Sequence, residues 1–348
     1  MTRDQLIEVL QYGTYAPSGD NCQPWLVKID NDTVSIILDT TKDQSLYNYK
    51  QIASLLSLGA FVENISIASM QVGFNVEINF QEGNELVAKI KFIDSQPIKH
   101  ELFEYIKKRC TNRKPYKDYT LSQEDISYLE TPYHFAKLKI ETNSSKINHL
   151  AHAASQNEAL VLNNTNLHNF LFSHIVWSET EMNAQKQGMY VRTLEMNSFQ
   201  EKIFSLCSNW RILKFLNKLS LYKKIAKENE IIYAKSSAFG LLVSDSLSSE
   251  NLFNVGRQMQ SLWLKVISVG LSLHPLTGII FLKNRIKNGG GEVFTPKETA
   301  LINSSYDTIT KVFDLKENDN AIFMFRLGKS DEPSAYSLKK DLNDLLIK

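Results

Sequence analysis

The chain has 348 residues, 43% of them hydrophobic and 22% charged, with a formal net charge of +1. These values predict a globular protein of one large domain or two ordinary ones, and they exclude an intrinsically disordered chain. A charge so close to zero gives no electrostatic reason to expect nucleic acid or an anionic membrane as a partner.

The cysteines and the N-terminus bear on cellular location. Cys22, Cys110 and Cys207 lie too far apart for a metal motif, and their odd number argues against a disulfide framework. The first eight residues include acids and no apolar segment of the kind that a signal peptide needs. No apolar run approaches the ~20 residues of a membrane helix. We therefore expect a cytoplasmic protein.

The first part of the chain alternates helix and strand signals. Thr2 and Gln5 form a capping-box pattern ahead of an amphipathic helix that ends near Tyr12. The pattern then predicts strands over 25–29 and 33–38 joined by a turn at Asn31-Asp32, a long apolar helix over 49–72, and strands over 74–80 and 86–92.

A second series of elements follows. The sequence predicts a helix over 99–109, a short helix after Ser122, a strand over 136–141, polar helices within 145–185 and Leu- and Lys-rich helices over 192–228. After these come a strand over 237–243, an apolar helix over 249–270, a turn over 275–278, a helix over 296–313, a strand over 321–327 and a basic tail. The region 192–228 has no strand signal, and residues from about 185 to 228 are predicted to be an insertion or lid.

The two long apolar helices align with each other. Gly59 and Gly73 in the first match Gly256 and Gly270 in the second, because both pairs are fourteen residues apart (73 − 59 and 270 − 256). Glycine within a helix costs about 1 kcal/mol against alanine, so paired glycines indicate a packing role. Chance similarity of two buried helices is the alternative. If the repeat is real, the chain contains two related halves, 1–97 and 98–348, packed at a pseudo-twofold core.

The stretch from Ala16 to Trp25 is the most distinctive loop. It holds Pro17, Ser18, Gly19 and Asn21, which are turn-forming residues, between a helix and a strand. It offers hydroxyl, amide and backbone N–H groups but no acid–base pair. We therefore expect it to hold a ligand that performs its own chemistry, and we predict no catalytic side chain.

A second candidate site is the cluster Arg109, Cys110, Thr111, Asn112 and Arg113. Two guanidiniums flank a hydroxyl, and arginine matches phosphate oxygens well. The C-terminus of the helix expected over 99–109 would disfavour an anion, so the arginines would have to dominate. A solvated basic turn is the alternative. Lys339 and Lys340 in the tail could add charge, or could simply belong to the surface.

These motifs resemble those of the FMN-dependent nitroreductase family. The loop 16–25 is similar to its "APS-x-x-N-x-QPW" motif, Arg109-x-Thr111-x-Arg113 to its basic phosphate motif, and residues 270–278 to its "G-hydrophobic-x-x-x-P-hydrophobic-x-G" turn. In ordinary members the basic motif precedes the loop, whereas here it follows the loop by about ninety residues. That order resembles the single-chain tandem (Acg-type) subgroup, in which a homodimer has become one chain.

The resemblance implies an α+β nitroreductase-like fold of two fused halves and one FMN per chain. It implies that Arg109, Thr111 and Arg113, with Cys110 between them and Lys339 or Lys340 nearby, bind the phosphate and ribityl. Pro17, Ser18, Gly19 and Asn21 would contact the flavin from the other half. Thr277 and Gly278 would lie beside N5 of the ring, where a backbone N–H can stabilise reduced flavin.

The implied activity is an oxidoreductase that passes electrons from NAD(P)H through FMN to a nitroaromatic, a quinone or a similar small acceptor. The alternative is a protein that stores or sequesters FMN under a lid formed by residues 185–228. We expect a monomer that acts as a pseudo-dimer and that could dimerise further, with no nucleic-acid or membrane partner.

Overall fold

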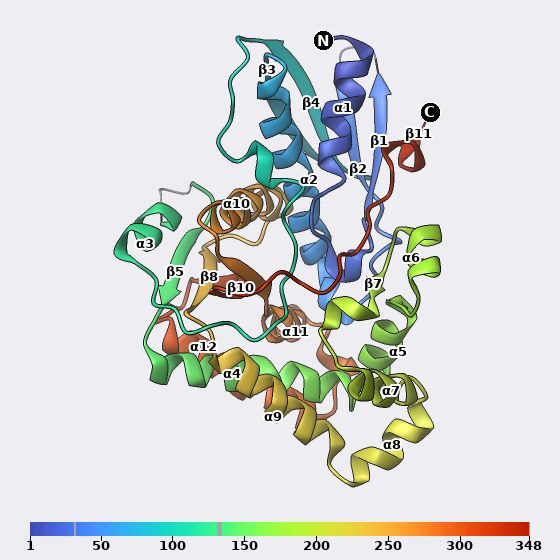
Figure 1. Ribbon diagram of the computed structural model, residues 1–348, viewed down its shortest axis with the longest axis vertical. Coiled ribbons are helices and arrows are strands. Elements are labelled where there is room, and N and C mark those ends of the chain that lie inside the picture. The colour runs from blue at the N-terminus through green and yellow to red at the C-terminus, as the bar shows by residue number, and fades with distance from the viewer. Residues whose placement is uncertain (31–32, 131–133, 348) are drawn as a thin grey trace.

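Two β-sheets share one hydrophobic core with a pair of long helices, α2 (Ile52–Gln71) and α10 (Ser249–Ser268), in the computed structural model of the chain (Figure 1). The structure describes residues 1–30, 33–130 and 134–347. The turn predicted at Asn31-Asp32 lies outside the described residues.

The first sheet belongs to the N-terminal part of the chain. Its helices and strands are α1 (Arg3–Gly13), β1 (Trp25–Asp30), β2 (Thr33–Leu38), α2, β3 (Phe74–Glu82) and β4 (Leu86–Asp94). One face packs on α1 and α2, and β3 alternates between half-buried and exposed side chains as a strand with one solvated face should. The four strands predicted from the sequence are confirmed.

The second sheet and its covering helices come from the chain after β4. They are α3 (Gln123–Leu129), β5 (Lys137–Glu141), α4 (Ser144–Val161), β8 (Ala238–Ser244), α10, β9 (Ser272–Pro275), α11 (Gly278–Lys287), α12 (Pro296–Val312) and β10 (Asn320–Gly328). The α10 face of this sheet joins the shared core, while α4, α11 and α12 cover its other face. Every residue of β8 is therefore buried.

The two sheets have the same topology. The first runs β1-β2-β4-β3 and the second β5-β8-β10-β9, with every one of these neighbours antiparallel. In both, the long helix connects the second strand to the third, and a short capped helix precedes the first strand. After each long helix a glycine takes a positive φ, 83° at Gly73 and 73° at Gly270.

The two long helices cross at their glycines. A Cβ on Gly59 would overlap the backbone of Phe253, and a Cβ on Gly256 would overlap the backbone of Leu56. These contacts are reciprocal, because Leu56 and Phe253 are separated by the same 197 residues as Gly59 and Gly256 (253 − 56 and 256 − 59). The packing role expected of the glycines is confirmed for Gly59 and Gly256, whereas Gly73 and Gly270 follow the ends of the helices with a positive φ.

Polar contacts between the helices repeat the same reciprocity. Ser261 Oγ donates to Glu63 Oε1 over 2.7 Å, and Gln260 Nε2 donates to Asn64 Oδ1 over 2.7 Å. The 197-residue offset relates Glu63 to Gln260 and Asn64 to Ser261, so each contact is the counterpart of the other. Such reciprocity is the pattern of an isologous interface.

Helix α2 is apolar on most sides. The segment Leu46–Gln71, which adds a short 3₁₀ turn to α2, is long and apolar enough to pass a composition test for a membrane span, although none was expected. In the structure, 89% of the 18-residue stretch that meets this test is buried inside the protein. A core helix of this kind is buried all round.

Between α4 and β8 the chain leaves the two-sheet framework. This excursion contains α5 (Thr165–His174), β6 (Ile175–Val176), α6 (Glu179–Gln185), β7 (Met189–Tyr190), α7 (Ser198–Cys207), α8 (Trp210–Lys218) and α9 (Leu221–Ala234). Helix α9 returns along α4, whereas α7 and α8 extend to the end of the molecule farthest from the N-terminal sheet (Figure 1). The helical character expected for 192–228 is confirmed.

The tail after β10 crosses back to the first sheet. Its last strand, β11 (Leu346–Ile347), pairs in parallel with β1 and extends that sheet to the order β11-β1-β2-β4-β3. The sequence predicts a basic tail but not this strand, because two residues carry no periodic signal.

Two predictions of local structure are wrong. Residues 99–109 do not form an α-helix: only a 3₁₀ turn over Phe103–Tyr105 forms there, because Leu102 and Ile106 pack between the long helices. No helix C-terminus therefore opposes an anion at Arg109. The predicted turn at 275–278 is instead the end of β9 and the start of α11.

Candidate functional site

The loop before β1 is held in a strained conformation. Asp20, Asn21 and Gln23 have φ of 44°, 57° and 51°, in the left-handed region that non-glycine residues rarely adopt. Ser18 Oγ accepts a hydrogen bond from the Gln23 N–H at 2.9 Å, and the Cys22 N–H donates to the Gly19 carbonyl. Such strain persists only where surrounding contacts fix it, which makes this loop a candidate binding element.

Two cations that follow β4 of the first sheet in the chain reach this loop. Arg109 Nη2 donates to the Tyr15 carbonyl at 3.1 Å, across 94 residues of sequence. Lys339 Nζ donates to the next carbonyl, that of Ala16, at 2.9 Å and to Asn21 Oδ1 at 2.7 Å. The loop and the Arg109 cluster, predicted as separate parts of one site, are therefore brought together.

The charge of these two cations is not balanced locally. Burial lowers the pKa of Arg109 to about 10, and its Nε has no hydrogen-bond partner. Burial and the positive charge of Arg109 hold the pKa of Lys339 well below its usual value. Among the described residues, no carboxylate forms an ion pair with either side chain. Unpaired desolvated charges are costly, so this location favours an anion.

An aromatic ring supports the arginine. The Arg109 guanidinium lies 4.6 Å from the ring centroid of Trp263 on α10, which contributes a cation–π contact. This contact helps to hold the guanidinium in place beside the loop. Trp263 gives no signal in the sequence beyond its place in an apolar helix.

Arg113 faces a different part of the loop. Its Nη1 donates to the Thr193 carbonyl at 3.1 Å and its Nη2 to Met189 Sδ at 3.5 Å. Burial lowers its pKa, and the nearby Asp20 carboxyl opposes that shift. The pKa of Asp20 is itself raised by burial and by Asp43, against the opposing charges of His174 and Arg113.

The segment 186–193 of the excursion contacts both parts of the site. Asn21 Nδ2 donates to the Gly188 carbonyl at 3.2 Å, and Gln23 Nε2 donates to the Lys186 carbonyl at 2.7 Å. Together with the Arg113 contact to Thr193, these bonds hold the segment on the loop and on the cation cluster.

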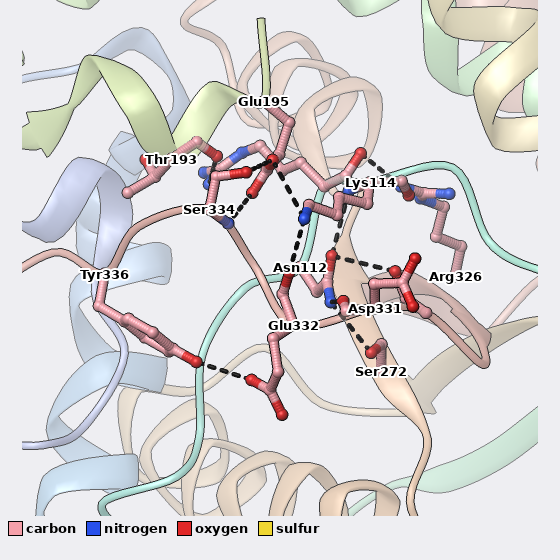
Figure 2. Close-up of polar contacts among 12 residues, drawn as sticks. Asn112, Lys114, Thr193, Glu195, Ser272, Arg326, Asp331, Glu332, Ser334 and Tyr336 are labelled. Carbon is pink, nitrogen blue, oxygen red and sulfur yellow. Dashed lines mark hydrogen bonds and ion pairs between the residues drawn. The ribbon is translucent and has the colours of Figure 1, made fainter.

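The tail and the excursion meet beside Asn112 (Figure 2). Asn112 Nδ2 donates to Ser272 Oγ and to the Asp331 carbonyl, at 3.2 Å and 2.9 Å. Ser334 donates to Glu195 through both its N–H and its hydroxyl, at 2.8 Å and 2.6 Å. This network fixes the tail between residues 112–114 and 193–195, and so fixes the approach of Lys339.

Arg326 is the main structural residue that the sequence does not reveal. It lies fully buried in the apolar strand β10. Its Nη2 donates to the carbonyls of Arg113 and Lys114 at 3.0 Å and 2.9 Å, and its Nε donates to His274 Nδ1 at 3.1 Å. Arg326 thereby attaches the cation segment to the second sheet. Burial, followed by the positive charge of Arg326, holds the pKa of His274 well below its usual value.

The contacts of the other predicted site residues differ from those of Arg109 and Lys339. The Thr277 hydroxyl is bonded to the backbone of Met324, and Asn157 packs against the α-carbon of Gly278. Lys340 meets the loop through its backbone N–H, which donates to Gln23 Oε1. The remaining three, half-buried along the loop and the cation segment, are Pro17, Thr111 and Cys110.

A protonatable pair lies near Gly278. Tyr233 OH donates to Glu158 Oε1 at 2.8 Å, while Glu158 Oε2 is buried without a partner. Burial raises the pKa of Glu158 to about 7. On the neighbouring residue of α4, Asn157 accepts a hydrogen bond from Tyr47 OH at 2.9 Å. A lone glutamate in a polar helix gives no sequence signal for such a role.

Comparisons with known proteins give distant similarities. The probable NAD(P)H nitroreductase PigM of Serratia sp. is 22% identical over 285 residues, which span 76% of this chain and 77% of that protein. The uncharacterized protein MT1398 of Mycobacterium tuberculosis is 21% identical over 95% of this chain, which spans only 47% of that protein's length. No protein-family profile matches the chain.

Solved structures give weaker likenesses. The FMN and NADPH-dependent nitroreductase NfnB of Sphigopyxis sp. aligns with 71% of this chain at 11% identity and a TM-score of 0.39. NfnB of Mycobacterium smegmatis, solved with NADPH, aligns with 70% at 13% identity and a TM-score of 0.38. Scores this low carry no argument about the chain. The sequence similarity to a nitroreductase is the finding that bears on function.

Proposed function

We propose that this protein is a nitroreductase-like, FMN-binding oxidoreductase whose cofactor phosphate binds between the Ala16–Gln23 loop and the Arg109 cluster. The observation that carries the proposal is the pair Arg109 and Lys339, desolvated cations on consecutive loop carbonyls with no carboxylate to balance them. A phosphate supplies the missing charge and several acceptors. The distant similarity to a nitroreductase supports the same class.

We propose further that the chain is a fused pair of nitroreductase-like halves. The shared strand order of the two sheets and the reciprocal contacts of α2 and α10 support this organisation. The loop comes from the first half and the cations from the second, so the site would lie at an internal counterpart of a subunit interface. One such pairing predicts one FMN per chain.

The residues fit FMN best at its phosphate end. Bound FMN would supply hydride and electron transfer between NAD(P)H and a nitroaromatic, a quinone or a similar small acceptor. Arg109 would orient the phosphate through the free Nε, Lys339 would add charge, and the strained loop would present Ser18 and Asn21. Glu158, with a pKa of about 7, can hold a proton near Gly278 at neutral pH.

A second function has a specific observation in its favour. Residues 186–193 bond to the loop and to Arg113, in the position of a cover over the proposed site. If this cover stays closed, the protein would store or sequester FMN and react slowly with nicotinamides.

The absorbance spectrum of the purified protein tests the cofactor. We expect a flavin spectrum, either as isolated or after FMN is added and unbound FMN is removed. Given bound flavin, anaerobic stopped-flow mixing with NADH and with NADPH separates the two functions. Bleaching within seconds indicates an oxidoreductase, and persistence of the oxidised spectrum indicates storage. A protein that takes up no FMN contradicts both.

The variant Arg109→Ala/Arg113→Ala tests the phosphate site. It should lose FMN retention while cooperative unfolding persists, since charge-assisted bonds to a phosphate contribute about 1.5–3 kcal/mol each. The matched control is Lys107→Ala/Lys108→Ala, two exposed cations in the same segment, which should retain FMN normally. Equal retention by both variants would mean that the phosphate binds elsewhere.

A further inference from the structure

The excursion that ends in α9 carries a charge that the net charge of the chain conceals. Residues 199–235 contain eight basic and three acidic residues, a net charge of +5. The rest of the chain has 31 basic residues (39 − 8) and 35 acidic ones (38 − 3), a net charge of −4. The overall value of +1, from which no membrane partner is expected, is therefore the sum of two regions of opposite sign.

The same segment holds an excess of exposed apolar side chains. Six of the thirteen large hydrophobic residues that are exposed among the described residues lie within it, and they are Phe199, Leu206, Ile212, Phe215, Leu219 and Ile231. Leu219 is 74% and Phe215 63% exposed. Single exposed hydrophobics need no explanation, but a cluster at one end of a molecule marks an interaction site.

Helix α8 separates the two kinds of side chain into parallel rows. Ile212, Phe215 and Leu219 follow the i, i+3, i+7 spacing of one helix face, and Arg211, Lys214 and Lys218 follow the same spacing beside them. All six side chains are exposed. None of the three cations forms an ion pair with any residue that the structure describes. We call these six residues the α8 surface.

The inner side of α8 is firmly packed, so the exposed rows belong to an ordered helix. Leu213 is fully buried, and the Trp210 ring lies 4.9 Å from the ring of His168. Asn217 Nδ2 donates to the Leu162 carbonyl at 2.6 Å. In Figure 1 α8 forms the end of the molecule, where the framework does not obstruct a flat partner.

We propose that the α8 surface binds the headgroup region of an anionic phospholipid bilayer, with α8 lying in the plane of the interface. Phe215 and Leu219 would enter the boundary of the acyl chains while Arg211, Lys214 and Lys218 meet lipid phosphates, which is the division of an interfacial amphipathic helix. The long basic side chains can extend along the apolar surface to reach the headgroups.

The charge argues against the other occupants of such a surface. A second copy of this chain would bring a segment of net charge +5 against an identical one, and like charges in contact disfavour association. An acidic protein could satisfy the cations, but it would need an apolar row to match Ile212, Phe215 and Leu219. A bilayer supplies negative charge and apolar depth together.

Vesicle co-sedimentation of the full-length protein tests the proposal. We expect binding to vesicles of phosphatidylcholine mixed with phosphatidylglycerol and little binding to phosphatidylcholine alone. Binding should weaken as salt rises, because salt screens charges at a surface. Equal binding to both vesicle types, or none to either, would overturn the proposal.

Two variants of α8 separate charge from apolar contact. Lys214→Gln/Lys218→Gln should weaken binding to the mixed vesicles about 30-fold, from about 1 kcal/mol for each lysine at an anionic surface. Phe215→Ser/Leu219→Ser should weaken it at least about tenfold through lost burial. Both should melt like wild type, since the four side chains are exposed.

Matched controls lie elsewhere on the surface. Lys297→Gln/Lys311→Gln removes two exposed cations of α12, and Ile98→Ser removes an apolar side chain that is 50% exposed. Both controls should bind vesicles like wild type. If the α8 variants bind as well as these controls, the surface is not the lipid site. If wild type ignores vesicles but self-associates until Phe215→Ser/Leu219→Ser prevents it, the occupant is a second copy and the proposal is wrong.

Discussion

The two sheets share a topology but differ in what covers them. The first exposes alternate residues of its edge strand β3 on a solvated face, while β9, the counterpart of β3 in the second sheet, has no exposed residue, and α4, α11 and α12 pack behind that sheet. The first sheet gains a fifth strand only when β11 returns from the far end of the chain. The common framework therefore does not determine which half carries which part of the site.

The site depends on this asymmetry. The strained loop lies between α1 and β1 of the first sheet, whereas Arg109, Arg113 and Lys339 lie outside that sheet, later in the chain. Residues 186–193, which bond to the loop and to Arg113, also follow β4 of the first sheet in the chain. A symmetric pair would contain two loops and two cation clusters. This chain places one of each against the other, which leads us to expect a single binding site.

The largest expected effect comes from breaking the contact between the halves. In Gly256→Leu a side chain must enter the space of the Leu56 backbone, so the helices must separate. We expect a loss of at least about 3 kcal/mol in the free energy of unfolding, measured by urea titration. Gly59→Leu should lower the free energy of unfolding by the same amount, within about 1 kcal/mol, if the two reciprocal contacts contribute equally to stability.

The control for this prediction is Gly83→Ala. No atom lies within 4 Å of a Cβ at Gly83, and its change in stability should stay within about 0.5 kcal/mol. A Gly256→Leu protein that unfolds like wild type would show that α2 and α10 are not tightly packed in solution.

Much of this framework could be predicted from the sequence. Both long helices follow from their apolar patterns, and the glycine spacing indicates where they cross, because only glycine allows two backbones to approach so closely. The alternation in Phe74–Glu82 likewise predicts a strand with one exposed face. Each of these patterns lies within a single helix or strand, and the helix or strand that it predicts is the one that forms.

The remaining features depend on contacts between distant residues. The sequence of Lys99–Arg109 predicts a helix, but no α-helix forms there. Leu102 and Ile106 instead pack in one apolar cluster with side chains of α2 and α10. The role of Arg326 requires carbonyls from residues 113–114, more than 200 positions earlier. The α8 surface was hidden because net charge averages a basic segment with an acidic remainder. Whether Thr277 and Gly278 meet a flavin ring stays a prediction.

A smaller effect should distinguish the covered face of the second sheet from the open face of the first. Burial raises the pKa of Glu158 on α4, behind the second sheet, to about 7, above the ~4.3 of an unfolded chain. Its contribution to stability is therefore fully present below about pH 4 and is lost as pH rises through about 7. Glu158→Gln should remove that dependence, which amounts to about 3.5 kcal/mol between the two limits.

Urea unfolding at a series of pH values from about 5 to about 8 measures this difference. Glu77→Gln is the matched control, since Glu77 lies exposed on β3 of the first sheet. Its stability should follow wild type at every pH. Parallel curves for Glu158→Gln and wild type would mean that the Glu158 carboxyl is ionised and hydrated in the folded protein.

The smallest effect concerns the helices that open the two halves. Thr2 and Ser122 each accept a hydrogen bond from the backbone N–H three residues later, while Gln5 and Asp125 bond back to complete capping boxes. Thr2→Ala and Ser122→Ala should each lower the free energy of unfolding by about 1 kcal/mol. The loss in the double variant should equal the sum of the two single losses. Ser198→Ala, at an exposed serine that follows the cap of α7, should change stability by less than about 0.5 kcal/mol. A cost confined to Ser122→Ala would mean that packing against α2 holds α1 without its cap, so the halves would differ even at their first turn.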